Sequence, residues 1–183
     1  MKKICLFISI LFCLNCGQSI SAQNKTMKEI FNELEKQDSV FKIGNETYKL
    51  SRERQMSSFA NMKNVLKLQD TGNPSKILVK DQMGVSVRIK DMYKKIFSRA
   101  RMEELKKSSF TMSCIFDTTG YIKEVTFSVK HAPDLTIEEI VKLENALKKM
   151  EIKHEDLGSG KHIYRIMIVC DFSILLREME IAK

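Results

Sequence analysis

The chain has 183 residues, of which 43% are hydrophobic and 30% are charged, and its formal net charge at pH 7 is +8. This length and this balance are ordinary for one compact domain that buries a substantial core. The positive charge is spread widely, with no run of five like charges and no aromatic-rich RNA-binding motif. The charge indicates a solvated basic surface. A basic chain could bind nucleic acid, but the missing RNA-binding motif and the export signal described next argue against that partner.

The N-terminal residues have the pattern of a secretory signal. Two lysines precede an apolar run from 4 to 14, which is too short to span a bilayer. We predict that residues 1–22 are a signal peptide cleaved after Ala22, and that the protein is exported to the periplasm or secreted, with no transmembrane span. The alternative is a lipoprotein anchored through Cys16, although Asn15 stands where that cleavage site prefers a small residue.

Residues 23–89 are predicted to form an N-terminal part made of helix and hairpin. Thr26 and Glu29 have the spacing of a capping box, which marks the start of a helix. Gly44 and Asn45 suit the two-residue primed turn of a hairpin. The predicted elements are a helix over 26–37, a hairpin over 40–50, a helix over 52–68 and a hairpin over 76–89.

A further helix is predicted over 90–107, where apolar residues recur at helical spacing. This segment carries seven basic residues and three acidic ones. Its basic face is a candidate site for an anionic envelope glycan or lipid, and such binding would weaken steeply with salt. The candidate anion-binding residues are Lys94, Lys95, Arg99 and Arg101.

Residues 110–174 are predicted to form a unit of two strands, a helix and a third strand. Alternating apolar residues indicate strands over 110–116 and 121–129, joined by a polar turn that contains Gly120. A second capping box, Thr136 with Glu139, precedes an apolar stripe at helical spacing. The unit then continues with a helix over 137–150 and a strand over 163–174.

The run FDTTGYIKEVTFSV resembles the C-terminal domain of TonB and the periplasmic proteins that carry a similar module. The positions that match are Phe116, Asp117, Gly120, Ile122, Val125 and Phe127. The resemblance covers about residues 90–176, and the Tyr-Pro pair expected just before the first strand is absent. It implies a ββαβ fold that works by binding other proteins.

These elements predict an α+β fold, with helices on one face of an antiparallel sheet. The C-terminal module is assigned to residues 90–183, and we expect it to form one compact unit with residues 23–89. In an antiparallel ββαβ sheet the third strand lies beside the first, since it would be parallel to the second.

Removal of the signal peptide leaves Cys114 and Cys170, which lie on the first and third predicted strands. An even number of cysteines in an oxidising compartment makes Cys114–Cys170 a candidate disulfide. The alternative is two buried thiols that pack as small hydrophobic groups. Both interpretations are compatible with the sequence.

No group of residues has the spacing of a catalytic site. The sequence contains no Gly-x-Ser-x-Gly, no phosphate-binding glycine loop and no Cys-x-x-Cys. Its histidines are His131, His154 and His162, and none forms a pair at helical spacing. We therefore predict a protein that is not an enzyme, with no catalytic residue, no metal and no cofactor.

The third strand is the candidate interaction site. An edge strand presents unpaired backbone groups, which must be covered or used. The hairpin predicted over 76–89 is one candidate cover; the alternative is a free edge that pairs with another envelope protein or with a second copy of the chain. The candidate residues of this edge are Tyr164, Ile166, Met167, Ile168, Val169 and Phe172. The predicted function is thus an exported, non-catalytic protein-interaction module.

Overall fold

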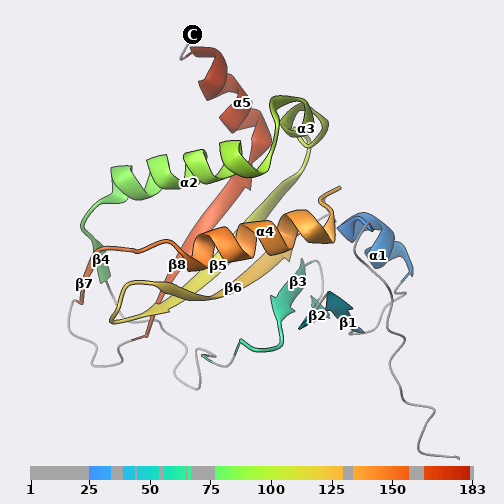
Figure 1. The fold of residues 1–183 in the computed structure, drawn as a ribbon, viewed down its shortest axis with the longest axis horizontal. Helices are drawn as coiled ribbons and strands as arrows, with labels where there is room; N and C mark the ends of the chain where they lie inside the picture. The colour runs from blue at the N-terminus through green and yellow to red at the C-terminus, as the bar shows by residue number, and fades with distance from the viewer. Residues whose placement is uncertain are drawn as a thin grey trace, which may run out of the picture.

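The computed structural model describes residues 25–33, 39–43, 45–53, 56–64, 66, 77–129, 134–156 and 163–181. The predicted signal peptide, Cys16, His131 and His162 lie outside these residues. The fold is α+β, as predicted, with an antiparallel sheet flanked by helices (Figure 1). The elements are α1 (Met27–Glu33), β1 (Ser39–Ile43), β2 (Glu46–Glu53), β3 (Met56–Asn61), β4 (Ile77–Val79), α2 (Gln82–Ile96), α3 (Arg99–Glu104), β5 (Ser109–Asp117), β6 (Ile122–Val129), α4 (Ile137–Lys148), β7 (His154–Asp156), β8 (Ile163–Asp171) and α5 (Phe172–Ile181).

One six-stranded sheet organises the molecule, in the order β1-β2-β3-β6-β5-β8. All of its neighbouring strands are antiparallel. β4 and β7 form a separate two-stranded sheet. Strands from 23–89 and from 90–183 share the large sheet, because β3 pairs with β6.

α4 lies across one face of this sheet, next to α2 (Figure 1). Its capping box is formed as predicted. The Thr136 hydroxyl accepts a hydrogen bond from the Glu139 N–H at 3.2 Å, and the Glu139 carboxylate accepts one from the Thr136 N–H at 2.8 Å. The apolar side chains that α4 buries are Ile137, Ile140, Leu143 and Leu147.

The turn between β5 and β6 depends on its glycine. Gly120 has φ 78°, in the left-handed region that other residues rarely adopt. A Cβ atom there would also lie 2.8 Å from the carbonyl oxygen of Ile152. Asp117 closes the turn by accepting a hydrogen bond from the Thr119 N–H at 2.9 Å.

The predicted hairpin over 76–89 is wrong, because residues from Gln82 onward belong to α2. Asp81 begins this helix: its carboxylate accepts a hydrogen bond from the Gly84 N–H at 2.9 Å, and its carbonyl accepts one from the Val85 N–H at 2.9 Å. Only the short β4 precedes the helix, and it pairs with β7. The hairpin that was one candidate cover for the edge of β8 is therefore not formed.

Two predicted helices also differ from the structure. The helix over 52–68 is wrong, since its described residues include the end of β2 and the whole of β3, where Phe59 packs against Phe127. The helix over 90–107 is interrupted between α2 and α3. Ser98 has an extended conformation there, and its hydroxyl caps α3.

The third strand ends earlier than predicted, at Asp171. The Asp171 carboxylate accepts hydrogen bonds from the backbone N–H and the hydroxyl of Ser173, at 2.9 and 2.6 Å. These bonds start α5, so the predicted strand residues 172–174 are helical.

The candidate disulfide is not formed, because Cys114 and Cys170 are both free and buried. The strands are neighbours as expected, but their register places Cys114 opposite Ile166 and Cys170 opposite Phe110. The two cysteines are thus offset by four positions, or about 13 Å along a strand, beyond the reach of a disulfide. Burial raises the pKa of each thiol to about 12, so both are unreactive.

Candidate functional site

β8 is an edge strand of the six-stranded sheet. It pairs with β5 from Ile163 to Asp171. On its other side, no described strand pairs with it. Its unpaired backbone groups are therefore the first feature of a binding site.

The direction of these backbone groups follows from one side-chain contact. Asn64, which follows β3, donates a hydrogen bond to the carbonyl oxygen of Val125 at 3.1 Å. Val125 therefore directs its backbone groups toward β3, and its partner Cys114 directs its own toward β8. Ile166, opposite Cys114, consequently bonds to β5.

The alternation then continues along β8. Even-numbered residues bond to β5, whereas Arg165, Met167 and Val169 direct their N–H and C=O groups outward. The two-residue turn between β1 and β2 gives the same result. The residues that close such a turn form a hydrogen-bonded pair, and the alternation from that pair through β2, β3 and β6 again directs the odd-numbered residues of β8 outward. Three consecutive odd positions are thus available to pair with an added strand.

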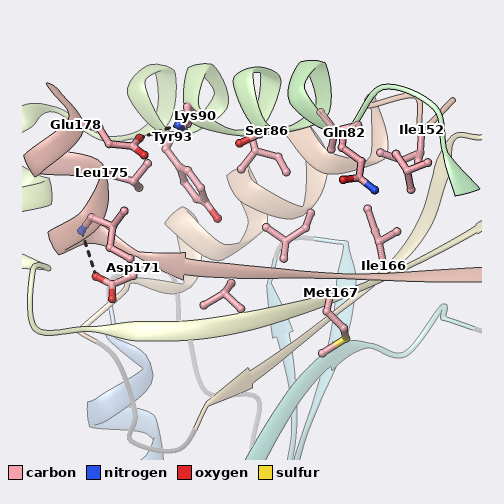
Figure 2. A pocket seen from close by; sticks show the side chains of 16 residues that line it. Gln82, Ser86, Lys90, Tyr93, Ile152, Ile166, Met167, Asp171, Leu175 and Glu178 are labelled. Carbon is pink, nitrogen blue, oxygen red and sulfur yellow. Dashed lines mark hydrogen bonds and ion pairs between the residues drawn. The ribbon is translucent and has the colours of Figure 1, made fainter. Parts of the chain in front are cut away.

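A groove of about 410 Å³ runs along this free edge. Figure 2 shows α2 above β8, with side chains of both elements directed into the space between them. The even-numbered residues of β8 face this side of the sheet. The apolar lining includes Val85, Ile89, Ile152, Ile166, Ile168 and Leu175.

Polar groups lie at the inner wall and at one end of the groove. Tyr93 points from α2 toward β8 (Figure 2), and its buried hydroxyl lies beside the thiol of Cys170, a weak hydrogen-bonding group. Burial, and then the nearby Cys170 thiol, raise the pKa of Tyr93, so this group stays a neutral donor and acceptor. Lys90 and Glu178 form an ion pair at 2.8 Å across the gap between α2 and α5.

Several elements around the groove carry exposed apolar side chains, three of which also line the groove. They belong to β4, α2, β8 and α5, and are between 45% and 84% exposed. Exposed apolar surface that gathers in one place commonly marks an interaction site. These residues, here called the apolar rim, are Leu78, Met83, Val87, Met167, Val169 and Ile174.

The residues predicted for the interaction edge divide into two groups. Residues 166–169 line the groove. Tyr164 is buried and donates a hydrogen bond to Asp156 at 3.0 Å, and Phe172 belongs to α5, where it packs against Phe97. The prediction missed Val85, Ile89 and Tyr93, because it placed the first two in a strand and gave the third, within another predicted helix, no role at the edge.

The candidate anion-binding residues do not form one basic face. Arg101 contacts the carboxylate of Glu139 at 2.7 and 3.0 Å, and Arg99 contacts Glu180 at 3.3 Å. Lys94 is exposed on α2, separated from both arginines by the interruption before α3. Lys95 is also exposed on α2. Both arginines thus pair with carboxylates of neighbouring elements.

The described part of the chain contains neither a membrane-spanning helix nor a cluster of metal ligands. No helix there is both long and apolar enough to cross a membrane. Among the same residues, no three His, Cys, Asp or Glu side chains are grouped so that they could hold a metal ion. The groove beside β8 therefore remains the principal candidate.

The chain matches no protein-family model, and no curated protein matches it. It is similar in structure to a crystallised DUF5043 family protein from Bacteroides uniformis ATCC 8492. The two are 18% identical, with a TM-score of 0.54, over 82% of this chain and 89% of that chain. At this identity the similarity shows a shared fold alone.

Proposed function

We propose that the chain is a non-catalytic module that binds an extended segment of a partner protein by adding it to β8 as a further strand. The observation that carries this proposal is the free edge of β8 beside an apolar groove. Main-chain hydrogen bonds would hold the segment, and the groove would select its alternate side chains.

The shape of the site favours an extended segment over a second folded copy. The N-terminal half of α2 projects beyond β8 on the side away from β5 (Figure 1). If β8 paired with β8 of a second copy about a twofold axis, the α2 helix of that copy would occupy the same layer, on the same face of the joined sheet, as the α2 of the first. A single extended segment carries no such layer and can lie beneath α2.

The partner is expected in the cell envelope, because residues 1–22 have the features of an export signal. The TonB-like pattern from Phe116 to Phe127 supports the same assignment, since the resemblance implies a fold that binds other proteins. Export and the envelope partner are thus parts of the proposal.

Export is tested on the N-terminus of the protein recovered from cells. We expect mass spectrometry to find a chain that begins at Gln23, because cleavage after Ala22 fits the signal pattern. A diacylated Cys16 would replace the secreted form by an anchored lipoprotein. A chain that retains residues 1–22 would overturn export by this signal.

Strand addition is tested by proline at an outward-facing position. A displayed library of nine-residue segments, the length of β8, is first selected on the purified protein. Met167→Pro should weaken binding of the selected segments by about tenfold or more, because proline removes one outward N–H and its ring obstructs the added strand. Affinity is measured by titration.

Met167→Ala is the matched control, since it removes the same side chain and keeps the N–H. It should bind within about threefold of the wild-type protein. Ile168→Pro should instead unfold the chain, because the Ile168 N–H bonds to β5. Equal binding by folded Met167→Pro and Met167→Ala would contradict strand addition, as would a library that yields no binder.

A further inference from the structure

The groove beside β8 also carries information about which segment it binds, and this inference rests on the proposed function. We infer that the bound segment runs antiparallel to β8, places large aliphatic side chains at alternate positions under α2, and carries an acidic residue near its C-terminal end, beside Arg165. Three features of the site lead to this pattern.

The direction follows from the sheet and from its edge. Every pair in the six-stranded sheet is antiparallel, and antiparallel pairing is slightly more stable per residue than parallel pairing. Outward groups at Arg165, Met167 and Val169 would then form closely spaced hydrogen-bond pairs with alternate residues of the segment. A segment antiparallel to β8 reaches Arg165 at its C-terminal end.

The aliphatic preference follows from the side chains between these outward positions. Residues of the segment opposite Ile166 and Ile168 would form non-hydrogen-bonded pairs, in which opposite Cα atoms are only about 4.5 Å apart. Their side chains would point into the groove, toward Val85 and Ile89 of α2. Apolar groups would fill this space, whereas a charged group there would be buried among apolar neighbours.

The acidic preference follows from Arg165. Its side chain is exposed, and it forms no ion pair with any described residue. At the other end of the edge, the Asp171 carboxylate already accepts the hydrogen bonds that start α5. The free charge of β8 is therefore positive and lies at one end, which distinguishes the two directions of a bound segment.

The experiment uses the nine-residue library selected on the wild-type protein and repeats the selection on Arg165→Glu. Wild-type binders should have aliphatic residues at two positions separated by one, with Asp or Glu beyond them on the C-terminal side. Binders of Arg165→Glu should keep the aliphatic pair and replace the acid by Lys or Arg. A selected wild-type binder should lose about three- to tenfold in affinity for Arg165→Glu, and its variant with lysine at the acidic position should recover it.

Filling the groove tests the aliphatic part separately. Ser86→Trp places a large side chain at the groove lining, whereas Asp91→Trp places the same side chain on the far side of α2. Both positions are exposed, so both variants should fold. Only Ser86→Trp should abolish binding of the selected segments.

The outcomes separate this inference from the proposed function. Selected segments that lose binding with Met167→Pro but show no alternate aliphatic residues, or ignore Arg165→Glu, would overturn the inferred pattern and leave strand addition in place. An acidic residue enriched at the N-terminal end would overturn the inferred direction. Segments indifferent to Met167→Pro would overturn strand addition itself.

Discussion

Leu147→Asp should unfold the protein. Leu147 lies on α4 with no exposed surface, where it packs under the six-stranded sheet. An aspartate there would be a buried, unpaired carboxylate, which costs several kcal/mol. Because the whole stability of a domain is about 5–15 kcal/mol, the substitution should remove the cooperative thermal transition seen by circular dichroism.

Asn145→Asp is the matched control, because residue 145 is on the exposed side of the same helix. It introduces the same carboxylate and should change the melting temperature by only a few degrees. If Leu147→Asp melted at the wild-type temperature, α4 would not pack on the sheet as described.

The sequence predicts elements well where local chemistry and burial agree. Thr136 and Glu139 begin α4 by the predicted capping box, and the apolar residues that this helix buries all belong to the predicted stripe. The strands on either side of Gly120 were likewise found, because their alternating residues match the two faces of the sheet. In both cases the pattern was complete within one continuous stretch of the chain.

α2 shows why the same reasoning failed elsewhere. Val85, Val87 and Ile89 alternate, which is typical of a strand. In the structure Val87 is 55% exposed, while Val85, Ile89 and Tyr93 face the sheet at helical spacing. An apolar residue at an exposed position therefore completed the alternation and obscured the helical pattern.

The groove could not be predicted, because it depends on how distant segments meet. Its walls come from α2, β8 and α5, and the expected cover of β8 was an element that does not form. The side of β8 that faces outward was also undecided, since the alternation is fixed only by contacts of β3 and β6 such as the bond from Asn64 to Val125. Local periodicity carries no information about such contacts.

Arg101 occupies the joint between α3 and the start of α4. Two of its nitrogens donate to the two carboxylate oxygens of Glu139 at 2.7 and 3.0 Å, and it also donates to the carbonyl oxygen of Asp134 at 2.8 Å. The Glu139 carboxylate also accepts the hydrogen bond from the Thr136 N–H that completes the capping box of α4. One carboxylate therefore holds both the N-terminus of α4 and the side chain of α3, with little exposed surface.

Arg101→Leu should destabilise the protein by about 2–3 kcal/mol at neutral pH, because it leaves a half-buried carboxylate without its charged partner. Burial alone would raise the pKa of Glu139, but the hydrogen bonds from Arg101 and Thr136 outweigh it and lower that pKa. A lowered pKa in the folded state contributes stability above the ordinary glutamate value of about 4.3, and this contribution is lost as the pH falls below it. The stability difference between the wild-type protein and Arg101→Leu, measured by urea unfolding, should thus be constant from about pH 6 to 8 and shrink toward pH 3.

Arg99→Leu is the control, since its ion pair with Glu180 is exposed and should contribute less than about 1 kcal/mol. Equal effects of the two substitutions, or a difference that grows in acid, would show that the Glu139 carboxylate does not depend on Arg101.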